Sequence, residues 1–196
     1  VNNDLIAIAW NDGVGVINYR GWGDANGWHY PYFHRESVDP GLNNGWRMPV
    51  VMSFVCNTGD FGNDFGGSGL DKCFGEVLTT GGSINNPKGA AAMIGPSDLD
   101  TDTRFNNVMG GALWDGLLEG RTPELAQALH AAKQAVAKEF DGIKETGLGG
   151  TQNIPVFYHH VYNVLGDPSL PVFLKTPSNI SALNDSGGII NDTLNL

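Results

Sequence analysis

One stretch organises the rest of the chain: Pro49–Val50–Val51–Met52–Ser53–Phe54–Val55–Cys56–Asn57–Thr58–Gly59. Its apolar, mostly β-favouring residues predict a buried strand over 49–56. The sequence Asn-Thr-Gly that follows is typical of a loop, so the strand ends at Cys56. Open α/β sheets carry their chemistry at the carboxyl ends of their strands. We therefore expect the Cys56 thiol to be held rigidly and to face outward.

A second strand is predicted over 14–20, and it too runs into a glycine-rich loop, Gly21–Trp22–Gly23–Asp24. Two such loops side by side would frame a cleft. Strands that alternate with helices predict an α/β fold with a mostly parallel sheet. Because only three or four strands are predicted, we expect a segment outside this chain to complete the sheet. The other predicted elements are helices over 3–12, 70–80 and 104–119, a helix opened by Thr122–Pro123–Glu124, strands over 90–95 and 170–174, and loops over 21–48, 57–71 and 141–153; the pattern leaves 156–163 undecided between helix and strand.

Composition limits the classes of partner. The chain has 196 residues, with 41% hydrophobic and 16% charged residues, which is typical of a globular domain. Its formal net charge of −10 argues against nucleic acid or an anionic membrane as a partner, because no basic field attracts phosphate. No run approaches the roughly 20 apolar residues of a membrane span. We expect one domain over 1–175, followed at 176–196 by a linker or the start of a further module. Because the chain lacks an initiator Met, we expect it to be a processed product or a piece of a longer protein.

Five short motifs occur in order along the predicted domain. They are Val16–Ile17–Asn18–Tyr19–Arg20–Gly21–Trp22–Gly23–Asp24, Ser53–Phe54–Val55–Cys56–Asn57–Thr58–Gly59–Asp60–Phe61, Cys73–Phe74–Gly75–Glu76, Gly95–Pro96–Ser97 and Gly166–Asp167–Pro168–Ser169–Leu170. In order and spacing this set resembles the gingipain-like cysteine peptidases of the caspase clan.

The resemblance implies a caspase-like three-layer sandwich, with helices on both faces of the sheet. It implies that the chain is the C-terminal part of a full catalytic domain, whose N-terminal strands are missing here. It further implies a secreted or cell-surface bacterial endopeptidase with a polypeptide substrate, and the upstream segment of the same precursor as a partner. No cofactor is required for such catalysis, but members of the family often bind structural calcium.

The resemblance implies a Cys–His dyad in which Cys56 is the nucleophile, with the backbone amides of Gly23 and Cys56 as oxyanion donors. Where the family has Tyr-x-Gly-His-Gly, this chain has Tyr-Arg-Gly-Trp-Gly, so Trp22 stands in place of the dyad histidine. An indole N–H only donates and cannot accept a proton. Either His29 or His34, both in the loop that Trp22 opens, serves as the base, or the domain is inactive.

Each candidate also has a structural interpretation. Cys56 fits a buried structural thiol, and the two histidines fit packing residues of an aromatic loop. The alternative function is then a catalytically inactive domain that acts as a binding or structural module of a secreted protein. Cys73 is expected to be structural, and two cysteines make neither a disulfide framework nor a zinc site.

By family position, Trp28, Ser97, Asp98 and Asp100 border the substrate pocket. An acidic wall there would select Lys or Arg, but acidic residues at a helix N-terminus explain the same pattern. The spacing of the carboxylates at 98, 100 and 102 also resembles the start of a calcium loop. An EF-hand is excluded, because Thr103 stands at the required glycine and no glutamate closes the loop. The sequence therefore predicts no metal ligands.

Overall fold

A computed structural model describes residues 3–62, 71–119, 122–174, 189–190 and 193–194. Its centre is a four-stranded sheet in the order β1-β5-β8-β11, in which β1, β5 and β8 are parallel and β11 is antiparallel to β8. The mostly parallel sheet predicted from the sequence is thus confirmed. Its strands are β1 (Val16–Arg20), β5 (Val50–Phe54), β8 (Ala92–Pro96) and β11 (Tyr162–Gly166).

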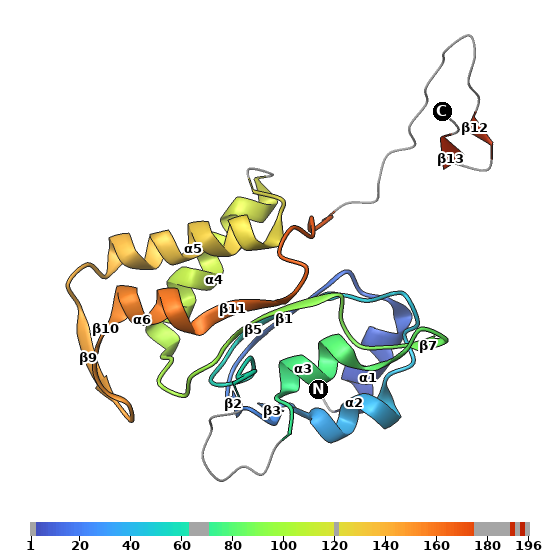
Figure 1. Ribbon diagram of the computed structural model, residues 1–196, viewed down its shortest axis with the longest axis horizontal. Helices are drawn as coiled ribbons and strands as arrows, with labels where there is room; N and C mark the ends of the chain where they lie inside the picture. The colour runs from blue at the N-terminus through green and yellow to red at the C-terminus, as the bar shows by residue number, and fades with distance from the viewer. Residues whose placement is uncertain (1–2, 63–70, 120–121, 175–188, 191–192, 195–196) are drawn as a thin grey trace.

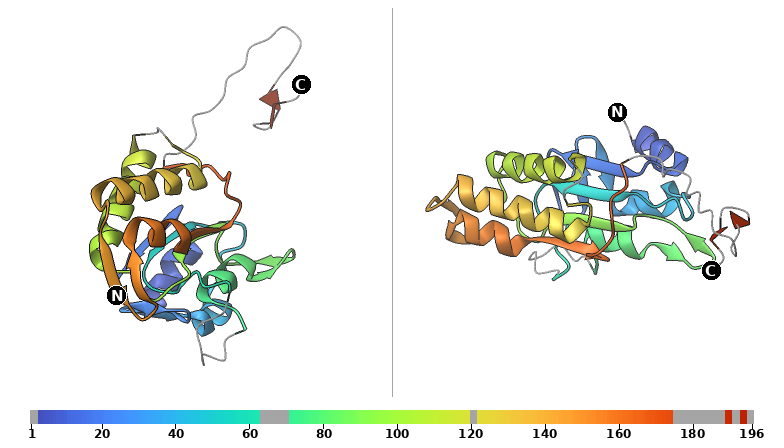
Figure 2. Two further views of the ribbon diagram at one scale, coloured as in Figure 1. Left: turned by 60° about the vertical axis from the view of Figure 1, so that its left-hand side comes forward. Right: turned by 90° about the horizontal axis from the view of Figure 1, so that it is seen from above.

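Helices cover both faces of this sheet, which makes three layers (Figure 1; Figure 2). β5 and β8 are buried along their whole length, because both of their faces pack against helices. This double burial explains why each reads as a continuous apolar run in the sequence. One layer consists of α1 (Asn3–Asp12), α2 (Arg35–Gly41) and α3 (Phe74–Thr80), and the other of α4 (Thr103–Leu118), α5 (Leu125–Glu139) and α6 (Ile154–Val161).

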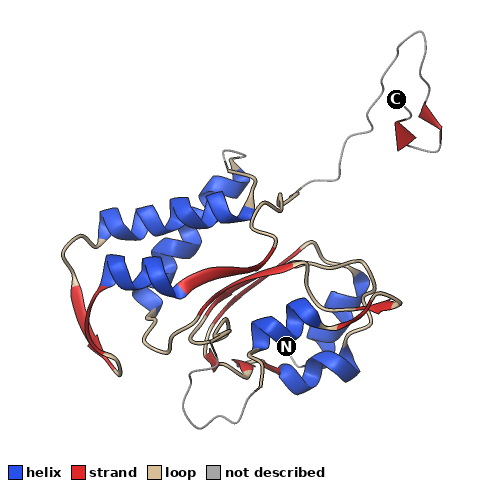
Figure 3. Cartoon of the chain, viewed as in Figure 1, coloured by secondary structure: helices blue, strands red, loops and turns tan. Residues whose placement is uncertain are grey.

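Short antiparallel strand pairs lie outside the central sheet (Figure 3). The predicted loop over 21–48 is wrong, since it contains three short strands and α2. The predicted loop over 141–153 is also wrong, since it forms an exposed hairpin beside α6 (Figure 1). The short strands are β2 (Gly23–Asp24), β3 (Gly27–His29), β4 (Tyr32–His34), β6 (Gly82–Ser83), β7 (Asn86–Pro87), β9 (Lys144–Gly147), β10 (Gly150–Asn153), β12 (Ile189–Ile190) and β13 (Thr193–Leu194).

The segment before α5 differs from the prediction for a physical reason. The helix begins at Leu125 with Glu124 as its N-cap residue, rather than at Thr122. The carbonyl of Pro123 accepts a hydrogen bond from the amide of Val172, and Glu124 forms a bridge with Pro171. Residues 170–174 are therefore bound to the start of α5 and do not form the predicted strand of the sheet.

The remaining predicted elements are placed as follows. The helices over 3–12 and 104–119 are confirmed as α1 and α4, and the undecided segment 156–163 lies in α6 and the start of β11. The helix predicted over 70–80 begins only at Phe74, with Cys73 as its N-cap residue. Most of 176–196 lies outside the described residues, so the linker stays a prediction.

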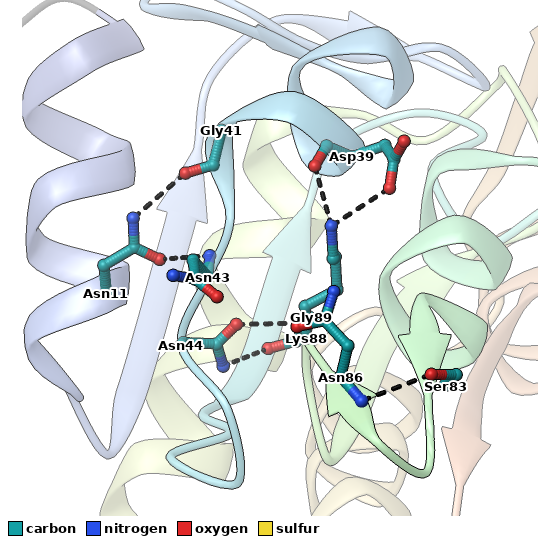
Figure 4. A network of polar contacts seen from close by, with 9 residues as sticks. All are labelled: Asn11, Asp39, Gly41, Asn43, Asn44, Ser83, Asn86, Lys88 and Gly89. Atoms are coloured by element: carbon teal, nitrogen blue, oxygen red, sulfur yellow. Dashed lines mark hydrogen bonds and ion pairs between the residues drawn. The ribbon is translucent and has the colours of Figure 1, made fainter.

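Polar contacts join the N-terminal segment to the segment before β8 (Figure 4). The buried side chain of Asn44 bonds both backbone groups of Gly89, with distances of 3.0 Å to the carbonyl oxygen and 2.9 Å to the amide nitrogen. Asn11 bonds the carbonyl of Gly41 and the amide of Asn43. These contacts fix the layer of α1 and α2 against the amino-terminal side of the sheet.

Candidate active site

Cys56 lies at the carboxyl end of the sheet. Arg20 and Phe54 pair at the ends of β1 and β5, and Trp22 and Cys56 each follow two residues later. Both residues therefore stand at the same edge, where parallel strands end together. The Cys56 side chain is partly exposed and its thiol is free, in contrast to a sealed core residue.

The turn after Cys56 is fixed by several hydrogen bonds. Asn57 adopts a φ of 58°, in the left-handed region that few non-glycine residues occupy. Its amide donates to the Asp98 carbonyl at 3.1 Å. The Thr58 hydroxyl lies 2.9 Å from that of Ser53. A strained, over-determined turn of this kind holds the preceding thiol in one place.

The polar contacts of the Cys56 sulfur are with Thr101, in the segment between β8 and α4. The Thr101 hydroxyl donates to the sulfur at 3.4 Å, and the thiol donates to the Thr101 carbonyl oxygen at 3.5 Å. Sequence reasoning missed Thr101, because a threonine between acidic residues carries no motif. The available signal was the position of Thr101 in the segment that follows the predicted strand over 90–95.

Trp22 carries its indole into solvent, with 75% of the residue exposed. Its carbonyl oxygen accepts hydrogen bonds from the Tyr19 hydroxyl at 2.8 Å and from the His29 amide at 2.8 Å. The backbone of His29 is thus directly adjacent to the residue at the expected dyad position.

The imidazole of His29 lies beside the carboxylate of Asp24, with 3.4 Å between Nε2 and Oδ2. The His34 ring packs on the ring of His29 at a centroid distance of 5.3 Å, and its Nδ1 lies 3.7 Å from the Glu36 carboxylate. Burial lowers the pKa of His34, against the opposing effect of Glu36. Within the described ranges, no hydrogen bond joins either imidazole to the sulfur of Cys56.

Two further residues of the β2–β3 region hold the backbone close to Cys56. A Cβ on Gly23 would lie 2.4 Å from the Gly27 carbonyl oxygen and 3.3 Å from the Val55 side chain, so only glycine fits there. Trp28 is 2% exposed, and its indole donates to the Ser53 hydroxyl at 3.0 Å. Trp28 therefore supports the strand that carries Cys56 and presents almost no surface to a substrate.

The three predicted pocket residues after β8 are partly buried. The hydroxyl and amide of Ser97 contact the Val161 carbonyl. The Asp98 carboxylate accepts from the Asp100 amide. The Asp100 carboxylate accepts from the amides of Leu148 and Gly149 at 2.8 Å each, at the tip of the β9–β10 hairpin. The acidic side chains are thus used to hold loops.

A pocket of about 430 Å³ opens between Asp100, the start of α4, the β9–β10 hairpin and α6. Aromatic and charged side chains both line it, and Arg104 and Glu145 form an ion pair there. The residues that line it include Asp102, Arg104, Phe105, Glu145 and Phe157.

Cys73 precedes α3, in the layer of α1, α2 and α3, and is buried with 0% exposure. Its side chain accepts the Glu76 amide, and the Glu76 carboxylate accepts the Cys73 amide, in a capping box at the start of α3. Burial raises the pKa of this thiol to about 11, so it remains protonated at neutral pH.

No group of three or more His, Cys, Asp or Glu side chains in the described ranges could hold a metal ion. None of the helices described is long and apolar enough to cross a bilayer.

The profile of peptidase family C25 matches residues 2–173, most of the sequence. The chain belongs to peptidase family C25. Similar curated members are gingipain R2 and gingipain R1 of Porphyromonas gingivalis, each 29% identical over 89 residues, which is 45% of this chain but only 11% and 8% of those proteins.

Solved structures of the C25 family share the fold. A crystal structure of the Arg-specific cysteine proteinase gingipain R has a TM-score of 0.69 at 22% identity, over 88% of this chain and 36% of that chain. A complex of gingipain pro- and mature domains from Porphyromonas gingivalis has a TM-score of 0.71 at 21% identity, over 88% of this chain and 37% of that chain. The fold is therefore caspase-like, and this chain spans well under half of those structures.

Proposed function

We propose that the chain is part of a secreted cysteine endopeptidase, in which Cys56 is the nucleophile and His29 is a relocated base. The observation that carries this proposal is the 2.8 Å hydrogen bond from the His29 amide to the Trp22 carbonyl. This bond joins the backbone of His29 to that of Trp22, the residue that stands where the resemblance predicts the dyad histidine. The Asp24 carboxylate beside Nε2 orients the ring.

Each step of peptide cleavage then has a group in this chain. His29 takes the proton of the Cys56 thiol, and the thiolate attacks the substrate carbonyl carbon. The amides of Gly23 and Cys56 donate to the resulting oxyanion. The imidazolium returns its proton to the leaving amine, and water then releases the acyl group from sulfur.

His29 fits the role of base better than His34. The His34 side chain is only 13% exposed, and its Nε2 is buried without a hydrogen-bond partner among the described residues. Burial lowers its pKa, so the ring stays neutral and packs against His29. We assign His34 a supporting role beneath the base.

The family relationship supports the wider assignments. The substrate is a polypeptide, the site of action is outside the cell or on its surface, and an upstream segment of the same precursor is a partner. The gingipain complex of pro- and mature domains is the precedent for such a segment. Structural calcium is a property to be tested in the full-length protein.

The test measures hydrolysis of a fluorogenic peptide library, with peptides cleaved after Arg or Lys included, by the full-length protein. Cys56→Ala should abolish hydrolysis. His29→Ala should lower kcat/KM by about 10²–10⁴, the usual contribution of one acid–base group. His34→Ala is the matched control, with a smaller effect. Equal rates for His29→Ala and the unsubstituted protein would overturn the assignment of the base.

A second candidate is a catalytically inactive, polypeptide-binding domain. The hydrogen bonds of the Cys56 sulfur favour this alternative, because among the described residues they join it to Thr101 and not to an imidazole. Under this alternative the full-length protein hydrolyses no library peptide, but library peptides bind equally well to it and to its Cys56→Ala variant.

A further inference from the structure

Thr101 contacts the reacting atom of the proposed site in two ways. Its hydroxyl donates to the Cys56 sulfur, and its carbonyl oxygen accepts from the thiol. A hydroxyl donor stabilises a thiolate, because hydrogen bonds to charged groups are stronger than those between neutral groups. A carbonyl acceptor has the opposite preference and stabilises the thiol. One residue therefore offers a partner to both protonation states of the nucleophile.

The structure holds Thr101 in place from both sides. Thr101 itself is buried, with 8% exposure. The preceding residue, Asp100, binds the tip of the β9–β10 hairpin. The amide of the following residue, Asp102, donates to the Tyr158 hydroxyl at 2.9 Å, and the Asp102 carboxylate caps α4 by accepting the Arg104 amide.

Among the described residues, no hydrogen bond joins a cationic side chain to the Cys56 sulfur. Tyr158 on α6 and Tyr162 on β11 interact with Cys56 electrostatically, and burial raises the pKa of both phenols. Both phenols therefore remain uncharged at neutral pH. The carboxylates of Asp98 and Asp102 accept backbone amides of their own segment, and that of Asp100 accepts amides of the β9–β10 hairpin. On the strand side, His29 is the ionisable group of the proposed dyad.

We propose that Thr101 is a catalytic residue whose hydroxyl stabilises the Cys56 thiolate by donating a hydrogen bond to it. Asp100 and Tyr158 are positioning residues, which hold the segment that carries this hydroxyl. The inference rests on the proposed role of Cys56 as nucleophile, but it does not depend on which histidine is the base.

The experiment measures the rate of alkylation of Cys56 by iodoacetamide from pH 5 to 10, followed by peptide mapping. Cys73 is an internal control, because it is fully buried and protonated and should stay unlabelled. Two matched pairs isolate the hydroxyl. Thr101→Val removes it with little change of shape, and comparison of Thr101→Ser with Thr101→Ala removes it from a smaller side chain.

Loss of the hydroxyl should raise the midpoint of the alkylation profile by about one pH unit in both pairs. The thiolate fraction at pH 6 falls about tenfold, and its higher basicity partly restores the rate, so alkylation slows roughly threefold. Thr101→Ser should retain a midpoint near that of the unsubstituted protein. A midpoint that depends on the methyl group instead of the hydroxyl, or that is the same in the three variants and the unsubstituted protein, would overturn the proposal.

The same series in the His29→Ala background separates this inference from the proposed function. If the hydroxyl-dependent shift persists there, Thr101 acts on the sulfur directly and the inference stands, whatever His29 does. If the shift is absent in both backgrounds while His29→Ala still loses hydrolysis, the base assignment stands and the role of Thr101 is refuted.

Discussion

The residue at position 22 sets this chain apart from the family pattern expected from the sequence. Trp22 stands where the resemblance predicts the dyad histidine, and its indole can donate a proton in a hydrogen bond but cannot accept one. Because Trp22 is 75% exposed, we expect that this position can be changed without disturbing the fold. It therefore offers a direct test of whether the cleft has kept the rest of a peptidase site.

We predict that Trp22→His increases peptide hydrolysis by roughly tenfold or more, because positions 22 and 56 each lie two residues beyond the paired ends of β1 and β5. The measurement is kcat/KM on the peptide library, with Trp22→Phe as the matched aromatic control. A Trp22→His variant no faster than Trp22→Phe would show that the sulfur is not within reach of this position.

His34 makes the stability of the fold depend on pH. Burial lowers its folded-state pKa below the unfolded value of about 6.5, so the unfolded chain binds more protons in that range. The contribution of His34 is complete above about pH 6.5 and is lost as the pH falls toward the folded pKa. We predict that His34→Gln flattens the decrease of Tm between pH 7 and pH 5. An unchanged slope would contradict the assignment.

At the scale of elements, burial decided what could be predicted from the sequence. The sequence predicts β5 and β8 because continuous apolar runs mark strands in the middle of a covered sheet. The three-residue strands β3 and β4 are too short to produce a period, and they were taken for loop. The segment around Val172 is apolar because it packs beside α5, which no local pattern distinguishes from a strand.

The same reasoning applies to the site. The position of Cys56 at a strand end could be predicted, because a strand and its loop are local features. The contact between Cys56 and Thr101 could not, since it depends on the register of β5 with β8 and on the course of the segment before α4. The Asp24–His29 pair depends on a short hairpin whose turn the sequence did not reveal.

The Asp100 carboxylate holds the tip of the β9–β10 hairpin. Gly147 approaches Asp100 so closely that a Cβ there would lie 2.3 Å from the carboxylate carbon. We predict that Gly147→Ala and Asp100→Ala both release the hairpin, which hydrogen exchange at the amides of Leu148 and Gly149 will detect. Gly111→Ala is the control, because an added Cβ at Gly111 in α4 meets no atom within 4 Å. Unchanged exchange in both hairpin variants would refute this role of Asp100.

At the scale of the whole molecule, the contacts of Figure 4 join segments that lie far apart in the sequence. Asn44 is 1% exposed and makes three hydrogen bonds, two to Gly89 and one to the Arg47 carbonyl. Loss of these bonds leaves the Gly89 amide buried without its acceptor, which is costly.

We predict that Asn44→Ala lowers the free energy of unfolding by about 3 kcal/mol. Urea denaturation measures this change. Ser83→Ala in the same region is the control, because Ser83 is exposed and its single bond to the Asn86 amide should contribute less than about 0.5 kcal/mol. Similar losses in the two variants would show that burial of Asn44 is not what matters.

The pairing of β8 with β11 has a kinetic consequence. Pro96 lies opposite Tyr162, and all of α4, α5 and α6 lie between them in the sequence. The last edge of the sheet can close only after a long loop has been brought together, and such distant pairings slow folding. Refolding should therefore take on the order of milliseconds to seconds. The pocket is lined by the start of α4 and by Ile154 and Phe157 of α6, the helix directly before β11, so we expect it to be complete only once this pairing has formed.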